Sequence, residues 1–221
     1  MNASPVHPAR SSQRGTGNSP DCEASARSGG FCGRRYASID QVPLFRYDLI
    51  MADPPWHYEL YSERGEAKAP QSQYETQGLD WIKSLPVADI ASPNAVLWLW
   101  ATNPLLPDAL DVMESWGFTF KTAGHWSKKT KNGKQAFGTG YLLRCAGEPF
   151  LIGTMGNPQT SRSVRSVIEG PIREHSRKPD EAFEAAERMM PNAVRIELFS
   201  REIRNGWDAM GDQLDKFEAA Q

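Results

Sequence analysis

The stretch YDLIMADPPWHYEL, residues 47–60, places an apolar run directly before Asp53, two prolines and Trp56. A residue that precedes proline is pushed into extended geometry, and the proline rings fix φ and donate no hydrogen bonds. The stretch therefore predicts a stiff strand exit that offers one carboxylate, free carbonyl oxygens and an aromatic face. These groups suit a flat base whose exocyclic nitrogen carries two hydrogens.

Methyl transfer to such a nitrogen is the chemistry that these residue types favour. The amine of adenine is a poor nucleophile because its lone pair is delocalised into the ring. If the Asp53 carboxylate and the Pro54 carbonyl accept its two hydrogens, the nitrogen becomes tetrahedral and its lone pair points at an electrophile held in line. A methyl sulfonium fits as that electrophile, since it needs no metal and its charge is favourable beside Asp53.

Two other interpretations of the tetrapeptide remain. An acid at the end of an apolar strand is also typical of a magnesium ligand, but the chain has no G-x-x-x-x-G-K-[ST] motif, which disfavours phosphoryl transfer. The prolines could equally mark a simple turn. The place of Asp53 at the end of a predicted buried strand favours a functional role, because ligands of parallel sheets bind beyond the carboxyl ends of the strands.

The composition describes one domain with a tail. The chain has 221 residues, enough to bury a sizeable core. Residues 1–35 are rich in Ser, Gly, Pro and Arg and predict a disordered tail, so the domain is expected over 36–221. The net charge is −2, so a nucleic-acid site has to come from local clustering.

Three cysteines without a close-spaced pair argue against a disulfide framework or a zinc site and predict a reducing, intracellular compartment. No apolar run is long enough for a membrane span, and the N-terminus lacks the apolar core of a signal peptide. His57, His125 and His175 are far apart and show no acid–histidine spacing, so no metal is predicted.

Strand and helix patterns alternate from Tyr36 onward, which favours an α/β fold with a mostly parallel sheet and helices on both faces. Strands are predicted over 46–52, 95–101, 118–126, 148–156 and 192–200. Helices are predicted within 74–86 and over 104–117 and 178–190. A Lys/Gly-rich loop is expected over 127–140 and an irregular Arg-rich segment over 157–177. Trp98 and Trp100 are expected in the sheet core.

ADPPW after YDLIM resembles the catalytic motif of the permuted adenine-N6 methyltransferases, the family of the eukaryotic mRNA m6A writer and its bacterial and phage relatives. Further segments follow in the family's order: AVLWLWATN, WGFTFKTAGHWSKK, GTGYLLRCAGEPFLIG, REHSRKPDEAFEAAERMMPNAVRIELFSR and GWDAMGDQL. The resemblance covers residues 36–216. It implies a Rossmann-like class I methyltransferase fold that is circularly permuted, because DPPW precedes the segment RIELF, which resembles the cofactor side.

The resemblance also implies S-adenosylmethionine as cofactor. The catalytic positions would be Asp53, Pro54, Pro55 and Trp56, with Asp53 also near the methionine end of the cofactor and Trp56 in contact with the base.

Four further positions match the family's cofactor site. Lys178 matches a lysine that approaches the carboxylate of the cofactor, and Arg201 a basic residue on its ribose and adenine side. Asp212 and Gln213 match a pair that binds the ribose hydroxyls; the family has Asn where this chain has Asp212.

Two basic segments predict the nucleic-acid face, because basic and aromatic side chains together suit a surface that follows a backbone and stacks bases. The cations are Lys128, Lys129, Lys131, Lys134, Arg144, Arg162, Arg165, Arg173, Arg177 and Lys178, and the aromatics are Trp126, Phe137 and Tyr141. Substrate contacts are expected at Trp56, Tyr74, Trp126 and Lys128.

The expected function is methyl transfer to the N6 amine of adenine in nucleic acid, in the cytoplasm of a bacterial or phage-infected cell and without a membrane. DNA is favoured over RNA, because the compact domain resembles the bacterial or phage branch. The alternatives are an RNA adenine-N6 methyltransferase, a non-catalytic nucleic-acid-binding partner subunit, and a methyltransferase acting on another amine. The recognition sequence, the strand preference and a homo- or heterodimeric state stay open.

Overall fold

The computed structural model describes residues 33–56, 77–140, 142–174 and 177–217. The strands form one eight-stranded sheet in the order β1-β8-β7-β2-β3-β5-β4-β6. Their bounds are β1 Arg35–Tyr36, β2 Tyr47–Ala52, β3 Ala91–Trp100, β4 Thr119–Lys129, β5 Gly147–Met155, β6 Val167–Pro171, β7 Arg195–Leu198 and β8 Asp208–Met210. The helices are η2 Ile39–Gln41, α3 Leu79–Ser84, α4 Val87–Ile90, η4 Asn103–Leu105, α5 Leu106–Ser115 and α6 Asp180–Met189. Residues 1–32 of the predicted tail lie outside the described residues, and the predicted end of the tail at residue 35 differs from the structure, where β1 begins at Arg35.

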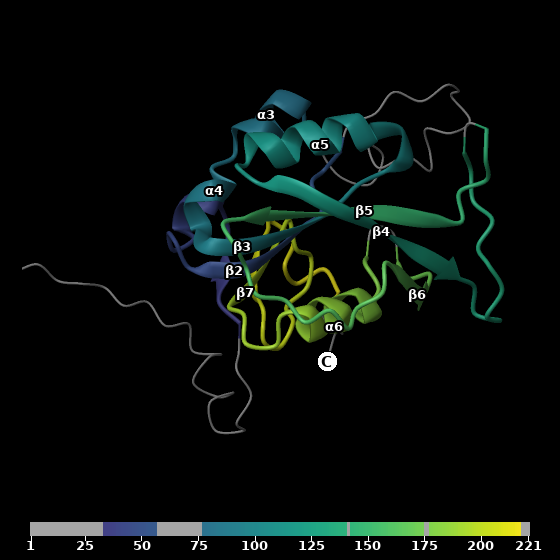
Figure 1. Cartoon of the computed structure of the whole chain (residues 1–221). Helices are drawn as coiled ribbons and strands as arrows, with labels where there is room; N and C mark the ends of the chain where they lie inside the picture. The colour runs from purple at the N-terminus through teal and green to yellow at the C-terminus, as the bar shows by residue number, and fades with distance from the viewer. Residues whose placement is uncertain (1–32, 57–76, 141, 175–176, 218–221) are drawn as a thin grey trace, which may run out of the picture. The chain divides into compact units, whose positions relative to one another are not determined.

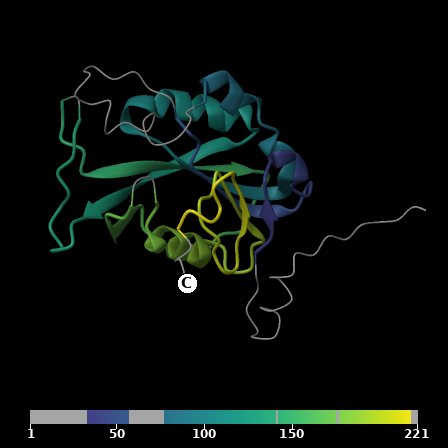
Figure 2. The same ribbon diagram turned by 180° about the vertical axis from the view of Figure 1, so that it is seen from behind.

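The predicted α/β class is confirmed. β2 runs parallel to both β3 and β7, and β8 runs parallel to β7 and β1. β5 is antiparallel to its neighbours β3 and β4, and β6 is parallel to β4. Helices α3, α4 and α5 cover one face of the sheet and α6 covers the other (Figure 1). In the reverse view the yellow C-terminal strands lie beside the purple N-terminal segment, as the pairing of β8 with β1 requires (Figure 2).

Two of the predicted irregular segments are partly wrong. β4 continues to Lys129, so the loop expected from residue 127 begins three residues later. The segment expected to be irregular over 157–177 contains β6, whose backbone pairs with the last residues of β4. Its sequence VIEGP includes a glycine and a proline, which are depleted in strands. Pairing with β4 therefore decided this strand against its weak local pattern.

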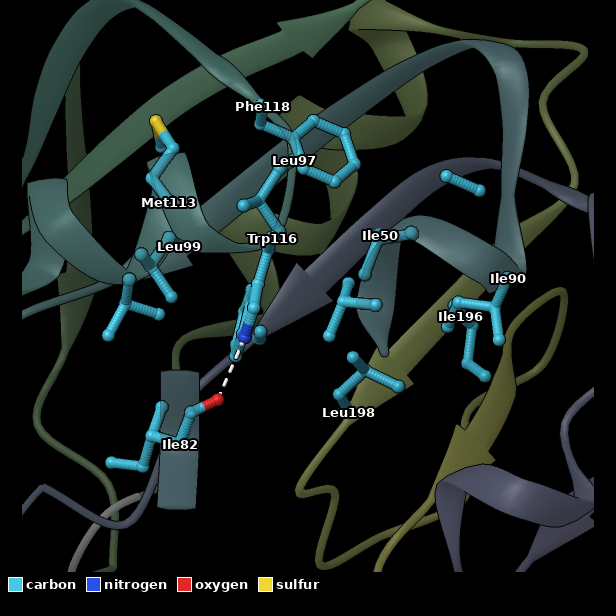
Figure 3. Packing of buried hydrophobic residues seen from close by; sticks show 14 of the residues in the cluster. Ile50, Ile82, Ile90, Leu97, Leu99, Met113, Trp116, Phe118, Ile196 and Leu198 are labelled. Atoms are coloured by element: carbon cyan, nitrogen blue, oxygen red, sulfur yellow. Dashed lines mark hydrogen bonds between the residues drawn. The ribbon is translucent and has the colours of Figure 1, made fainter. Parts of the chain in front are cut away.

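The core has one layer on each face of the sheet because strand side chains alternate between the faces. Ile50 of β2 and Leu97 of β3 pack toward α3 and α5, where Trp116 Nε1 donates a hydrogen bond of 2.8 Å to the carbonyl of Ile82 (Figure 3). Trp98 and Trp100 are buried in the layer that faces α6, as expected.

Within the described ranges no helix has the length and hydropathy of a membrane span; α5 and α6, the longest there, have ten residues each.

Candidate active site

Asp53 follows the last residue of β2, which lies between β7 and β3. Its side chain is 19% exposed. It lines a cavity of about 500 Å³ together with Pro55 of the same motif and with Arg201, Asp212 and Gln213. The parallel pairing of β2, β7 and β8 explains this meeting, because the segments that follow parallel strands emerge at the same edge of the sheet.

The two prolines turn the chain sharply after Asp53. The carbonyl of Pro54 accepts a hydrogen bond of 2.8 Å from the backbone N–H of Trp56, and the carbonyl of Pro55 accepts one of 3.0 Å from Gln77. The Trp56 indole is 5% exposed, and its Nε1 donates to the carbonyl of Trp100 at 3.1 Å. This placement favours a role for Trp56 in anchoring the motif to β3 over the expected base contact. The Pro54 oxygen has a second lone pair, and Pro54 is buried and is not among the residues that line the cavity.

A chain of alternating charges begins at Asp53. Lys178 Nζ lies 2.8 Å from Asp53 Oδ2 and 2.6 Å from Glu148 Oε1, and Lys128 Nζ lies 2.9 Å from Glu148 Oε2. The Lys178 side chain is only 6% exposed, and its ammonium lies 5.3 Å from the ring centre of Trp100. Sequence reasoning missed Glu148. The one local signal was an acid in front of the apolar strand PFLIG, and such acids are common on surfaces.

The pKa shifts of these residues follow from burial and from the alternating charges of their neighbours. Burial raises the pKa of Asp53, and Lys178 opposes that shift. Burial would also raise the pKa of Glu148, but Lys178 and Lys128 lower it to about 2. Burial disfavours the Lys178 ammonium, yet its two carboxylate partners raise its pKa, so the ammonium stays charged at neutral pH. Of the described residues none donates a hydrogen bond to Asp53 Oδ1, which leaves this oxygen to accept from a ligand.

The positions expected to hold a cofactor meet at the same cavity, with one difference. Nε and Nη2 of Arg201 donate to Oε1 of Gln213 at 3.2 and 3.1 Å, and Asp212 is exposed beside them. Lys178 contacts the Asp53 carboxylate and is not among the residues that line the cavity. The donors and acceptors at the cavity suit the hydroxyls and charged groups of S-adenosylmethionine.

A family model described as MT-A70 matches residues 47–213, which include Asp53 and all the predicted cofactor positions. The chain belongs to the MT-A70 family. MT-A70 proteins are Rossmann-like methyltransferases whose methyl donor is S-adenosylmethionine, so the resemblance seen in the sequence is confirmed. The circular permutation stays a prediction.

Relatives of this MT-A70 chain include bacterial and eukaryotic proteins. It is 29% identical over 192 residues to the type II methyltransferase M.MunI of Mycoplasma sp, a match that covers 79% of this chain and 80% of M.MunI. It is 32% identical over 176 residues to an N(6)-adenosine-methyltransferase MT-A70-like protein of Arabidopsis thaliana, covering 76% of this chain and 24% of that protein. To the human N(6)-adenosine-methyltransferase catalytic subunit METTL3 it is 30% identical over 192 residues, covering 83% and 30%. The chain thus matches about a quarter to a third of the length of these eukaryotic relatives.

The expected substrate contacts of the MT-A70 domain lie mostly in the interior. Trp126 is 3% exposed, and its Nε1 donates to the carbonyl of Gly170 at 3.1 Å. The Lys128 ammonium lies 4.5 Å from the ring centre of Trp126 and is paired with Glu148. Trp126 therefore has little free face for a base. Tyr74 lies outside the described residues.

The predicted basic face is smaller than its sequence suggests. Three arginines and three acids form one ion-pair chain, with the pairs Arg173–Asp180, Arg204–Asp180, Arg204–Glu202, Arg177–Glu202 and Arg177–Glu174. Lys129 is paired with Glu169. Of the predicted cations, those that are exposed and form no ion pair with another described residue are Lys131, Lys134, Arg144, Arg162 and Arg165. The charges that neutralise the others come largely from separate elements, which a scan of the local sequence does not bring together.

Among the described residues no group of three or more His, Cys, Asp or Glu side chains could hold a metal ion. His57 and His175, two of the histidines weighed in the sequence, lie outside them.

Proposed function

We propose that the chain transfers the methyl group of S-adenosylmethionine to the exocyclic N6 amine of adenine in nucleic acid. The observation that carries this proposal is the Asp53 carboxylate. One of its oxygens is held by Lys178, the other accepts no hydrogen bond from a described residue, and Asp53 lines a cavity together with Arg201 and Gln213. Membership of the MT-A70 family supports both the reaction and the methyl donor.

The residues of this chain would orient the amine. Lys178 fixes one oxygen of Asp53, so the carboxylate cannot rotate freely, and Glu148 holds Lys178 from its other side. The second Asp53 oxygen and the Pro54 carbonyl then accept the two amine hydrogens, which turns the nitrogen lone pair toward the reacting carbon. S-adenosylmethionine supplies an electrophilic methyl group on sulfur. After transfer the nitrogen carries one excess proton, and Asp53, whose pKa is raised by burial, is placed to accept it.

DNA is the favoured substrate in this proposal. The match to M.MunI extends over 80% of that protein, whereas the matches to the two eukaryotic proteins cover 24% and 30% of their lengths. The matched region thus accounts for most of the bacterial relative and for a minority of each eukaryotic one. RNA is the second candidate, because the identity to the two N(6)-adenosine-methyltransferases is equally high. In either polymer the adenine has to leave its stack to reach Asp53, so single-stranded or flipped substrates are expected.

We expect the protein to act in the cytoplasm.

The test is transfer of labelled methyl from S-adenosylmethionine to matched single-stranded DNA, duplex DNA and RNA, followed by digestion to nucleosides. Wild type is compared with Asp53→Ala and with Asp111→Ala, a control in which an exposed acid on α5 is removed. We expect an N6-methyladenine nucleoside with wild type and Asp111→Ala and none with Asp53→Ala. The preferred polymer decides between DNA and RNA.

Two results would contradict the proposal. Cofactor binding without methylation of any polymer would favour the non-catalytic partner subunit. Methylation of cytosine in place of adenine would favour the third alternative, transfer to another amine.

A further inference from the structure

Trp81 differs from every other tryptophan of this chain. It is 44% exposed and lies on the wall of the cavity that contains Asp53. The other six are at most 5% exposed: Trp56, Trp98, Trp100, Trp116, Trp126 and Trp207. A single exposed apolar side chain needs no explanation on a convex surface. Trp81, however, lines this cavity together with Leu85 and Phe199, and these three apolar side chains are hereafter called the apolar wall of the cavity.

On the α3 side, the backbone that carries the apolar wall is anchored to the core. Trp81 belongs to α3, and the next residue, Ile82, is 1% exposed in the core. The Ile82 carbonyl accepts the hydrogen bond from the buried Trp116 indole (Figure 3). The burial and hydrogen bond of Ile82 therefore fix the backbone next to Trp81, and Trp81 itself lines the cavity.

Phe199 forms the other half of the wall in an unusual backbone conformation. It directly follows β7 and has a φ of 62°, which a bulky side chain rarely adopts. The neighbouring backbone fixes this conformation. Ser200 N–H donates to the carbonyl of Met210 at 2.9 Å, and a Cβ at Gly211 would clash with the Ser200 carbonyl oxygen. Such outliers cluster at ligand sites. The Phe199 ring centre lies 6.4 Å from that of Trp81, with the rings inclined by 58°.

The cavity thus has two kinds of surface. Asp53, Arg201 and Gln213 offer charges and hydrogen-bond partners, and Trp81 and Phe199 offer aromatic rings. S-adenosylmethionine has a matching division, with a charged amino-acid end, a positive sulfonium and a flat purine. The sulfonium is favoured beside the Asp53 carboxylate, and the aromatic wall is then the surface of the cavity that suits the purine.

We propose that Trp81 contacts the purine ring of the methyl donor and that α3 thereby forms one wall of the adenosyl site. This inference rests on the proposed function, because it takes S-adenosylmethionine as the ligand. It adds a binding residue that the sequence motifs did not indicate. The indole face that water now reaches becomes covered when the purine stacks on it.

The test uses S-adenosylhomocysteine and 5′-methylthioadenosine as probes that carry the purine, and methionine as a probe that lacks it. Binding is followed by calorimetry and by tryptophan emission. In wild type the two purine probes should change the emission and methionine should not. Trp81→Phe should bind S-adenosylhomocysteine but lose most of the emission change, because the six remaining tryptophans are buried. Trp81→Ala should weaken its affinity about tenfold, since stacking of one base contributes about 1–3 kcal/mol.

The matched control is Phe120→Ala, which removes an aromatic side chain of nearly equal exposure, 45%, from β4. Phe120 does not line the cavity, so the affinity should stay at the wild-type value. An unchanged affinity in Trp81→Ala, with no emission change in wild type, would overturn this inference and leave the proposed function intact. No binding heat in wild type would overturn the proposed cofactor and the inference with it. If Trp81→Ala fails to fold, Trp81→Phe carries the test.

Discussion

Two aspartates of this sheet region have little solvent exposure, and they differ in how many of their carboxylate oxygens accept hydrogen bonds from the protein. Asp208 is the first residue of β8 and is 2% exposed. Its Oδ2 accepts a hydrogen bond of 2.8 Å from the Tyr47 hydroxyl, and its Oδ1 accepts one of 2.7 Å from the backbone N–H of Arg34. Arg46 Nε lies 3.8 Å away. Asp53 follows the end of β2, lines the cavity, and has Lys178 on one oxygen and no donor from a described residue on the other.

The difference indicates that the Asp208 carboxylate stabilises the fold, whereas the Asp53 carboxylate is able to bind a ligand. Both oxygens of Asp208 have donors and the side chain is 2% exposed, so a ligand has little access to it. Burial raises the pKa of its partner Tyr47, which therefore stays a donor. Asp53 keeps an unused acceptor and is held by a buried ammonium, so it is oriented but not saturated. Most buried polar atoms have at least one hydrogen-bond partner, and Asp53 Oδ1 has none among the described residues. An incompletely paired carboxylate with a shifted pKa at a cavity is therefore a functional candidate.

The largest effect is expected from Asp53→Asn. The amide keeps the shape of the side chain but loses the charge and turns one acceptor into a donor. Methyl transfer should fall at least about a hundredfold, the scale of losing one oriented polar group at a reaction centre. Far-UV circular dichroism should match wild type, because Lys178 keeps Glu148 as its partner. Activity near the wild-type level would remove the distinction between the two aspartates.

The second effect concerns stability and is expected from Asp208→Asn. Two hydrogen bonds to a buried carboxylate are weakened, and hydrogen bonds to charged groups contribute about 1.5–3 kcal/mol each. We expect a loss of about 2 kcal/mol in the free energy of unfolding, measured by urea denaturation. The turnover of the folded enzyme with saturating substrates should equal that of wild type. A large loss of turnover at unchanged stability would place Asp208 with Asp53.

The smallest effect concerns Glu197 of β7. Among the described residues this third carboxylate has neither an ammonium partner, as Asp53 has, nor donors on both oxygens, as Asp208 has. The Ser200 hydroxyl donates to it at 2.7 Å, but burial raises its pKa to about 7 from the ordinary value of 4.5. Below pH 4.5 the folded and unfolded states both hold the proton. Between about pH 4.5 and 7 only the folded state holds it, so stability falls as pH rises, and above about pH 7 the loss is complete.

Wild type should therefore lose roughly 1.5 kcal/mol more than Glu197→Gln between about pH 5.5 and 7, measured by denaturation at several pH values. Glu184→Gln on α6, where the side chain is 63% exposed, serves as control and should follow the wild-type curve. Parallel curves for wild type and Glu197→Gln would show that Glu197 is ionised throughout this range.

Much of the frame could be predicted from the sequence. The apolar run before DPPW predicted β2 and placed Asp53 at its end, where it lies. The alternation of strand and helix patterns predicted the α/β class, and the apolar run AVLWLWA predicted a buried strand. These inferences succeeded because periodicity and proline chemistry act between near neighbours in the chain. The predicted site positions Asp53, Arg201, Asp212 and Gln213 do meet at one cavity, and their roles there stay predictions.

Only the tertiary structure decided which side chains face one another. It paired Lys178 with Glu148 as well as Asp53, neutralised Arg173 and Arg177 with acids, and placed Trp81 opposite Phe199. Each of these contacts joins residues from different elements, whose approach depends on strand order and direction. A local pattern carries information on the period and the burial of its own segment. The partner of a charge or of an aromatic face is set by packing across the sheet, so the sequence named the residues of this site and the fold determined their neighbours.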